Sequence, residues 1–374
     1  MQIIGVNSGT SVDSLDIAVF NVSKNKISFL VGQSFKYPTI LSDEIRGLGP
    51  NSSILQVDNI SIKLGEFVGR KINNLLKSSK YKPEVIGMHG QTIHHANDIK
   101  NTTTIQITEA DSVALLTKID VAHDFRKKDV VSGGTAAPFV PILDHILFQS
   151  IKRPFIAQNL GGIANTTLVH KNFDKTIGYD SGPANSLIDK VIYKYSKGEY
   201  LYDKNGEFAR KGKIYKPLLS KILSNNYFRR KPPKSTGNIE FGIQYVNDLL
   251  SYCSRKDLQI YDILATLTEV TVETIARSYE QFIFKNHKIK QVVLSGGGTK
   301  NKFLLGRLKR RLPMIDFLIS DDSGMPSRFK ECALFAYLAF LRVNKVEVNL
   351  KNITGSKYKV ILGKISSKWK SYQI

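Results

Sequence analysis

The chain has 374 residues, which is enough for two or three domains with a sizeable core. Its composition, 42% apolar, 10% aromatic and 23% charged, is that of a globular protein and excludes disordered, collagen-like and low-complexity classes. Cys253 and Cys332 lie far apart without a CxxC motif, which excludes a disulfide framework and a zinc ribbon and favours a reducing cytoplasm. No leader pattern or apolar run of about 18 residues occurs, so we expect neither secretion nor a membrane partner.

The formal net charge of +22 raises the question of a nucleic-acid partner. Of the 54 basic residues only 14 are Arg, and the 40 Lys are spread along the whole chain. Base readout and bidentate phosphate contacts favour clustered Arg. The two basic clusters, residues 229–234 and 307–311, are local and lack interleaved aromatic residues. We interpret the excess charge as compositional bias and expect no nucleic-acid partner.

The first 120 residues predict alternating strands and helices. A β-branched run at 2–6 and a second apolar run at 15–20 predict two strands joined by a tight polar turn. Apolar residues recur at helical spacing through 58–76, which predicts an amphipathic helix. A buried strand is expected at 85–88, another strand at 103–107, and a helix at about 110–117.

The same pattern restarts after a polar link at 149–154, with no repeat of short fixed period. The expected elements that follow are strands at 155–159, 165–169 and 291–294, and helices at 242–253, 262–282 and 328–342. This order predicts two α/β lobes with a cleft between them. We place the N-terminal lobe at residues 1–150, completed by a C-terminal segment at about 345–374, and the C-terminal lobe at 151–344.

Three turns rich in glycine follow predicted strands, at the strand ends where open α/β sheets bind ligands. The first spans residues 7–16 and carries two carboxylates, so it could hold phosphate and a magnesium ion, or it could be an ordinary hairpin turn. The second contains Gly161 and Gly162, and the third contains Gly296, Gly297 and Gly298. The P-loop and GxGxxG patterns are both absent, which argues against the usual nucleotide-binding folds.

Three further groups could act in chemistry. Asp180 lies in a predicted tight turn before a helix, where it is either a helix cap or, if Ser181 or Asn185 caps instead, a general base. His89, His94 and His95 lack the spacing of a metal site, so we interpret them as surface or substrate-contact residues. Arg126 is either an anion-binding residue or part of an exposed salt-linked loop.

Blocks spread over nearly the whole chain resemble, in order, those of the anhydro-N-acetylmuramic acid kinase family. They read GVNSGTSVDSLD, MHGQTI, VAHDFRKKDV, GGTAAPFVP, NLGGIANTT, GYDSGPANSLID, YDKNGEFA, PPKSTG, ATLTEVT, LSGGGTKN and KECALFAYLA. The resemblance implies two ribonuclease-H-like lobes of the sugar kinase, Hsp70 and actin type, closing on ATP and sugar. It also implies a cytoplasmic homodimer that works in peptidoglycan recycling. The implied reaction converts 1,6-anhydro-N-acetylmuramic acid, ATP and water into N-acetylmuramic acid 6-phosphate and ADP.

The resemblance also assigns roles to residues. Asp180 matches the block with the catalytic base, and Asp13 is the expected Mg²⁺ carboxylate. The expected sugar contacts are His89, Gln91, Arg126 and Glu331, with Arg126 on the lactyl carboxylate. The expected ATP-binding residues are Gly9, Thr10, Ser11, Val12, Asp13, Ser14, Leu15, Asp16, Gly161, Gly162, Gly296, Gly297 and Gly298.

The sequence departs from the family pattern at three places. Ser14 replaces a usual Gly, which puts nucleotide affinity in doubt because Ser restricts the backbone. Thr108-Glu109-Ala110 stands where GDP is common, and Gly133-Gly134-Thr135-Ala136-Ala137-Pro138 replaces GGQGAP. Two alternatives therefore remain: a kinase of the same fold that acts on another sugar, and a degenerate nucleotide-binding or nucleic-acid-binding protein.

Overall fold

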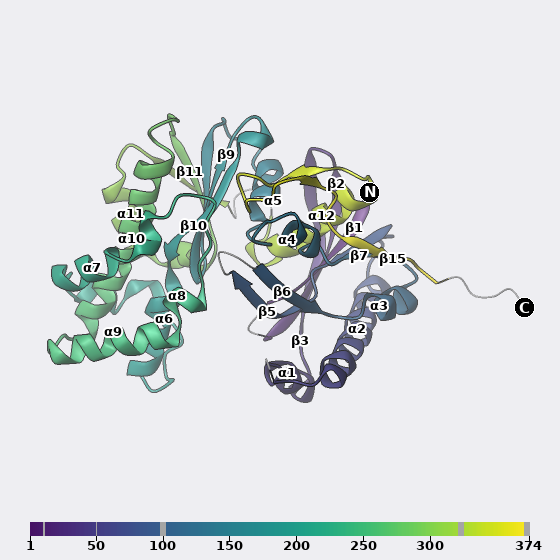
Figure 1. The fold of residues 1–374 in the computed structure, drawn as a ribbon, viewed down its shortest axis with the longest axis horizontal. Helices are drawn as coiled ribbons and strands as arrows, with labels where there is room; N and C mark the ends of the chain where they lie inside the picture. Colours follow the sequence, from purple (N-terminus) through teal and green to yellow (C-terminus); the bar gives the residue numbers. More distant parts are fainter. Residues whose placement is uncertain (10–11, 50, 98–101, 321–324, 370–374) are drawn as a thin grey trace, which may run out of the picture. The chain divides into compact units, whose positions relative to one another are not determined.

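The computed structural model describes residues 1–9, 12–49, 51–97, 102–320 and 325–369. These residues form two compact units, shown in Figure 1 (colours follow the sequence). Unit 1 comprises Met1–Gln149 and Ser323–Ile374, and unit 2 comprises Ser150–Asp322. The sequence-based division placed residues 323–344 with the C-terminal lobe, whereas in the structure their helix packs on the sheet of unit 1.

Unit 1 is built on a mixed six-stranded sheet. In spatial order its strands are β15 (Lys364–Ser366), β7 (Asp120–His123), β4 (Val85–Met88), β1 (Gln2–Ser8), β2 (Ser14–Ser23) and β3 (Lys26–Lys36). The first three strands in sequence are antiparallel, and β4 and β7 run parallel to β1 and β4. A separate hairpin pairs β5 (Gln91–Asn97) with β6 (Thr102–Ile107), and a short one pairs β13 (Val348–Asn349) with β14 (Lys359–Val360).

Helices cover both faces of this sheet. On one face α2 (Ile54–Lys77) and α3 (Ala110–Thr117) lie side by side and bury Ile4 and Val6 of β1 in the main core of the unit (Figure 1). On the other face α12 (Lys330–Val343) packs against β1, β2 and β4. Smaller helices complete the unit: α1 (Thr39–Arg46), α4 (Lys127–Val131), α5 (Val140–Leu147) and the 3₁₀ turn η7 (Ser327–Phe329).

Unit 2 repeats the sheet of unit 1 with other sequence. Its strands lie in the order β10 (Ile177–Pro183), β9 (Ile163–Val169), β8 (Phe155–Leu160), β11 (Gln291–Ser295) and β12 (Asp316–Ile319). Again three antiparallel strands are followed by two parallel ones, which is the ribonuclease-H-like arrangement. The expectation that the second half restarts the pattern of the first is confirmed, as is the α/β class of both parts.

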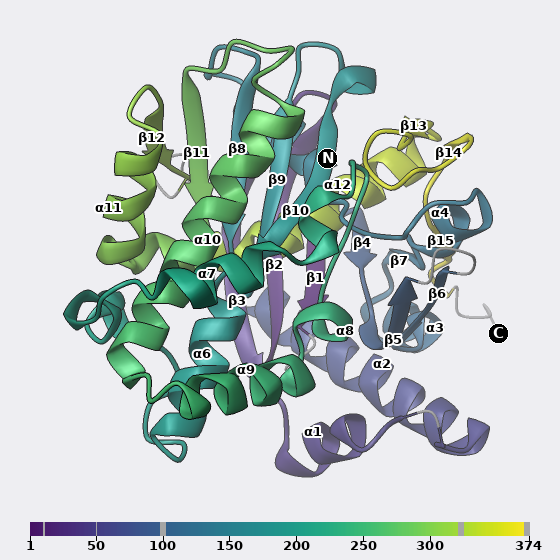
Figure 2. The ribbon, with the colours of Figure 1, turned by 60° about the vertical axis from the view of Figure 1, so that its left-hand side comes forward.

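A long helix, α10 (Ile260–Phe282), covers the sheet of unit 2, as Figure 2 shows. The remaining helices of the unit are α6 (Asn185–Tyr195), α7 (Lys216–Leu223), α8 (Asn238–Phe241), α9 (Ile243–Arg255) and α11 (Lys302–Arg311). Its 3₁₀ turns are η1 (Phe173–Lys175), η2 (Lys204–Gly206), η3 (Ala209–Lys211), η4 (Asn226–Arg229) and η5 (Gly297–Lys300). Within the part of the chain that the structure describes, no helix combines the length and the apolar composition that a membrane span requires.

One sequence-based element is wrong in a way that affects the site. Residues 178–185 were expected to form a tight turn because Gly178, Gly182 and Pro183 are turn formers. In the structure most of this segment belongs to β10 (Ile177–Pro183), which pairs with β9 and has a register shift between Asp180 and Gly182, while Asn185 begins α6. Cross-strand pairing overrides the local turn preference here. The strands β3 and β5 were also missed, whereas β4 and α3 have the predicted bounds.

Two paired glycines allow α12 to lie directly on the sheet of unit 1. Gly5 and Gly87 are neighbours in the β1–β4 register. A Cβ atom at Gly5 would lie 1.8 Å from the Cys332 carbonyl oxygen, and one at Gly87 would lie 2.1 Å from the Phe335 carbonyl oxygen. Backbone atoms of a packed helix cannot yield to such contacts, so neither position accepts a side chain without moving α12.

We therefore predict that Gly5→Ala lowers the free energy of unfolding of unit 1 by about 3 kcal/mol, because overpacking displaces α12. Urea titration followed by circular dichroism measures the effect. Gly49→Ala is the matched control in the same unit, since a Cβ there has no neighbour within 4 Å. Equal stability of the two variants would contradict the close approach of α12 to β1.

Candidate functional site

The polar turn between β1 and β2 follows the buried end of β1. The Val12 amide donates to the Gly9 carbonyl oxygen over 3.0 Å, and Val12 has a φ of 55°. Thr10 and Ser11 lie outside the described residues. Ser14 begins β2 and is not among the described residues with positive φ, so its side chain meets no backbone conformation that requires glycine.

The two carboxylates of this turn differ in their surroundings. Asp13 is exposed and lies 3.4 Å from the Arg46 guanidinium. Asp16 is on β2 opposite Asn7, and its Oδ1 accepts from Arg328 Nε over 3.1 Å. Among the described residues, no group of three or more His, Cys, Asp or Glu side chains could hold a metal ion. A single carboxylate such as Asp13 is enough for Mg²⁺ when phosphate oxygens and water supply most of the ligands.

Gln91 is buried, with 1% of its surface exposed, and lies in a network behind the end of β1. Ser8 Oγ donates to Gln91 Oε1 and accepts from the Tyr37 hydroxyl over 2.8 Å. The main-chain N–H of Gln91 donates to Thr108 Oγ1 over 3.3 Å. The side chain predicted to contact sugar therefore holds Ser8 in this structure, and a role in sugar binding remains a proposal.

His89, Arg126 and Glu331 are brought together on the α12 side of unit 1. The His89 ring stacks on Phe335 with 4.4 Å between ring centroids, and its pKa is held well below the usual range by burial and by the Arg126 charge. Burial lowers the pKa of Arg126 to about 10, so the guanidinium remains charged at neutral pH. His89 is thus neutral beside a permanent cation, a combination suited to an anionic sugar substituent.

Glu331 lies in the first turn of α12, beside Asn7 of β1. Asn7 Nδ2 donates to Glu331 Oε2 over 2.5 Å. Solvent reaches part of the residue, but the protein packed around its carboxyl group raises the pKa of Glu331, while the Asn7 hydrogen bond and the Arg126 charge lower it. The N-terminal turn of a helix also favours a negative charge.

Asp180 lies on β10 in unit 2 and is 5% exposed. Asn165 Nδ2 donates to its Oδ1 over 2.5 Å, and the Thr236 amide N–H donates to its Oδ2 over 2.9 Å. Burial raises the pKa of Asp180 to about 6, against these two donors and the Lys234 charge, which lower it. A carboxyl group with such a pKa is mostly ionised at neutral pH and basic enough to accept a proton.

The cap predicted beside Asp180 does not form. The N-terminus of α6 has no side-chain cap, and Asn185 Nδ2 instead donates to the carbonyl oxygens of Leu160, over 3.0 Å, and Gly161, over 2.8 Å. The Gly162 carbonyl oxygen accepts from the Ala184 amide over 2.9 Å. The second glycine turn is therefore tied to the start of α6, close in the chain to Asp180.

The third glycine turn packs against the end of β8 in unit 2. Gly296 has a φ of 86°, and a Cβ there would lie 2.6 Å from Asn159 Oδ1. A Cβ at Gly298 would lie 2.7 Å from the Leu160 Cβ atom, whereas one at Gly297 would meet nothing within 4 Å. Gly296 and Gly298 are thus required by packing inside unit 2, and Gly297 faces open space.

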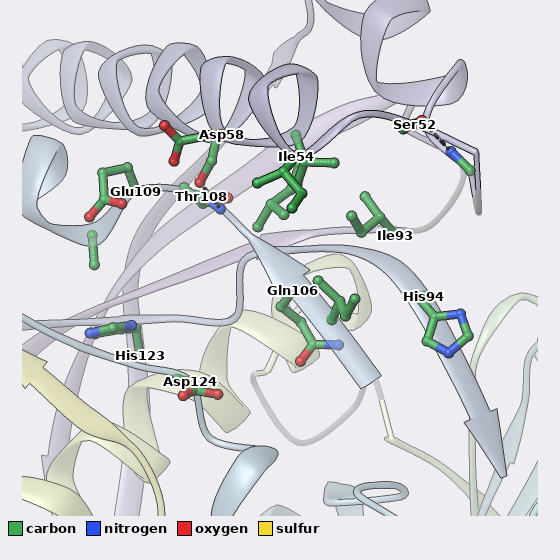
Figure 3. Close-up of a pocket in the computed structure, with 16 residues that line it drawn as sticks. Ser52, Ile54, Asp58, Ile93, His94, Gln106, Thr108, Glu109, His123 and Asp124 are labelled. Atoms are coloured by element: carbon green, nitrogen blue, oxygen red, sulfur yellow. Dashed lines mark hydrogen bonds between the residues drawn. The ribbon is translucent and has the colours of Figure 1, made fainter. Parts of the chain in front are cut away.

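A pocket of about 750 Å³ lies elsewhere in unit 1, and Figure 3 shows its lining. Ile54 and Ile93 contribute apolar surface, and Asp58 and Glu109 lie next to each other at one end. Its lining includes His94, which the sequence left open as a surface or substrate-contact residue, but none of the residues to which the family resemblance assigns a role. The pocket therefore does not extend the predicted site.

The family model described as Anhydro-N-acetylmuramic acid kinase matches residues 1–368. This chain belongs to that family. An anhydro-N-acetylmuramic acid kinase from Caldanaerobacter subterraneus subsp. tengcongensis is 35% identical over 97% of this chain and 96% of its own length. One from Trichormus variabilis is also 35% identical, over the same shares of the two chains. The resemblance inferred from the ordered blocks is thereby confirmed.

A solved structure of component A of the (R)-2-hydroxyglutaryl-CoA dehydratase from Acidaminococcus fermentans also aligns with this chain. The match covers 90% of this chain and 98% of that one, with a TM-score of 0.45 and 12% identity. A likeness at this level carries nothing about function, so the family assignment rests on the full-length sequence matches.

The sequence analysis missed the residues that surround the predicted base. Asn165 lies in the block NLGGIANTT, of which only Gly161 and Gly162 were predicted to act, and Lys234 lies in PPKSTG, for which no role was predicted. Lys234 is 7% exposed, and its ammonium group donates to the Tyr227 carbonyl oxygen over 3.2 Å and lies 4.7 Å from the Tyr227 ring centroid. The feature that marks Lys234 is its deep burial, and burial cannot be read from the sequence.

The electrostatics around Arg126 generate a testable shift. The pKa of His95 is lowered to about 4 by burial and then by the charge of Arg126. We predict that Arg126→Gln raises the pKa of His95, because a repelling cation is removed. An imidazole NMR titration measures it, with Arg70→Gln as control because Arg70 is exposed and pairs with Glu66. An unchanged His95 titration in Arg126→Gln would contradict the predicted coupling.

Proposed function

We propose that this chain is the ATP-dependent kinase that opens 1,6-anhydro-N-acetylmuramic acid with water and yields N-acetylmuramic acid 6-phosphate. Membership of the family supports the reaction. The observation in the structure that carries the proposal is the buried Asp180 carboxyl, with a donor on each oxygen and a pKa of about 6. Such a carboxylate can act as a general base that takes a proton from water at neutral pH.

In the proposed reaction Asp180 removes a proton from the water molecule that attacks the anomeric carbon. The bond between that carbon and oxygen 6 breaks, and oxygen 6 then attacks the γ-phosphorus of ATP. The bond from that phosphorus to the β,γ-bridging oxygen breaks in the same step, and ADP leaves. A carboxylate with a pKa near 6 is charged at pH 7 yet more basic than an exposed aspartate. The backbone donor from Thr236 and the amide donor from Asn165 hold it in one orientation.

On the sugar side, the charged Arg126 is the proposed partner of the lactyl carboxylate. The neutral His89 lies beside it and can donate or accept a hydrogen bond without adding charge. We propose that Glu331 contacts the sugar from the first turn of α12, held by Asn7. Gln91 would act indirectly, since its side-chain carbonyl oxygen accepts from Ser8.

For the nucleotide, we propose contacts from the turn at residues 9–16, from Gly161 and Gly162, and from Gly297, which faces open space. Asp13 would hold Mg²⁺ together with phosphate oxygens and water, and the ion would neutralise charge on the transferred phosphoryl group. The exposure of Asp13 leaves its carboxylate accessible for that purpose.

We also propose that the enzyme is a cytoplasmic homodimer in peptidoglycan recycling. Both cysteines are free and buried, which suits a reducing compartment. The family supports the pathway. The proposal gives no role to nucleic acid, and the net charge of +22 is left as compositional bias.

Mass spectrometry of a reaction with ATP, Mg²⁺ and 1,6-anhydro-N-acetylmuramic acid should detect the 6-phosphate. We predict that kcat/KM rises with pH through about 6, because the base must be ionised.

Asp180→Asn should lose turnover by about 10²-fold or more while still binding ATP. Asp189→Asn is the control, since Asp189 is another carboxyl of unit 2 with a raised pKa, of about 7. Near-normal turnover in Asp180→Asn would remove Asp180 from the base role.

The role of Arg126 predicts a selective binding defect. Arg126→Gln should raise KM for the sugar about 10- to 100-fold, the usual result of losing a hydrogen bond to a charged group. An anhydro sugar without the lactyl group should react equally with the wild type and the variant. Arg70→Gln again serves as the control on an exposed helix position. A loss that is equal for both sugars would place Arg126 outside carboxylate recognition.

A further inference from the structure

Four side chains at one end of the unit 2 sheet form a hydrogen-bonded row. Ser295 Oγ at the end of β11 donates to Asn159 Oδ1 of β8 over 3.4 Å. Asn159 Nδ2 donates to Asn165 Oδ1 of β9 over 3.0 Å. Asn165 Nδ2 donates to Asp180 Oδ1 of β10 over 2.5 Å. The row therefore crosses four neighbouring strands and ends on the proposed base.

The chemistry of the end group sets the direction of every bond in this row. An ionised carboxylate only accepts hydrogen bonds, so Asn165 must present its NH₂ group to Asp180. Its carbonyl oxygen then faces Asn159, which must also present NH₂. The oxygen of Asn159 in turn faces a hydroxyl donor, and reversing any one amide would oppose two acceptors or two donors.

The start of the row lies at the third glycine turn. Asn159 Oδ1 occupies the place that a Cβ at Gly296 would need, since the two would be 2.6 Å apart. Asn159 is paired in register with Ser295 on one side and with Asn165 on the other. The strands themselves therefore hold the two asparagines at a fixed spacing.

The charged and titratable groups that face Asp180 act on it in other ways than the hydrogen bonds of this row. Lys234 lowers its pKa through charge, and Glu240 raises it. The Tyr227 hydroxyl donates over 2.7 Å to the main-chain oxygen of Asp180, not to the carboxylate. Among the described residues, the donors to the Asp180 carboxylate are the Asn165 side chain, on Oδ1, and the Thr236 main-chain amide, on Oδ2.

We propose that Asn165 and Asn159 are positioning residues for Asp180, forming a directed relay of side-chain amides from the glycine turn after β11 to the base. This inference rests on the proposed function of Asp180. The relay fixes Oδ1 and leaves its remaining lone pair for the attacking water. Asn159 acts only through Asn165, so its removal lets the Asn165 amide rotate without deleting it.

The test is a ¹³C NMR titration of aspartate carboxyl carbons in the whole ligand-free chain, with the Asp180 signal identified by its loss in Asp180→Asn. Asn165→Leu should raise the pKa of Asp180 by about one pH unit or more, because a donor to the charged form is lost. Asn159→Leu should raise it in the same direction by less. The double variant should match Asn165→Leu alone, since both changes act at one contact.

Asn172→Leu is the matched control, because Asn172 is exposed and caps the 3₁₀ turn η1 that precedes β10. Asn165→Ser and Asn159→Ser replace the leucine variants if those fail to fold. An Asp180 pKa that stays at the wild-type value in Asn165 variants would overturn the proposal. A shift in Asn165 variants with none in Asn159 variants would overturn the relay, because the row would end at Asn165.

A kinetic readout separates this inference from the proposed function. If the kinase reaction occurs, the pH at which kcat/KM rises on the acid side should increase across the variants in the same order as the NMR pKa values. If the chain does not phosphorylate the anhydro sugar, the proposed function fails, but the NMR titration still decides whether the relay acts on Asp180. An acid limb that stays fixed while the NMR pKa moves would overturn the positioning role.

Discussion

A buried carboxylate is stable only where hydrogen-bond donors replace the water it has lost, and Asp180 meets this condition with one donor for each oxygen. Burial raises its pKa and the donors lower it, which leaves a value of about 6. Each donor comes from a different segment: Asn165 from the neighbouring strand, and Thr236 from a loop distant in sequence. The arrangement of unit 2 around β10 thus serves both the fold and the proposed chemistry.

In unit 1 the same order of strands carries a helix that packs unusually close to the sheet. The paired glycines Gly5 and Gly87 remove side chains from the centre of the sheet, so that α12 touches the backbone directly. This close approach carries Glu331 to Asn7 and Phe335 under His89. Glu331 and His89, two of the residues proposed to contact sugar, are therefore positioned by the same packing of α12 that closes the core.

Several features could be predicted because they depend on neighbouring residues. The apolar period of α2 and the short apolar run of β4 were sufficient to find both elements. The strand β10 was missed because Gly178, Gly182 and Pro183 locally favour a turn, and only pairing with β9 makes the segment a strand. The family resemblance placed Gln91 at the sugar, and only the fold shows that its side chain is buried and accepts a hydrogen bond from Ser8.

The sequence by itself determined the family, the alternation of strands and helices, and the choice of Asp180, because ordered motifs and apolar periodicity are properties of the chain. Only the tertiary structure decided which groups surround that carboxylate. Asn159 and Asn165 are six positions apart in sequence and become neighbours by strand pairing, and Lys234 reaches the same site from a distant loop. Burial and hydrogen-bond partners arise from segments that meet only on folding, so they cannot be read from any one of them.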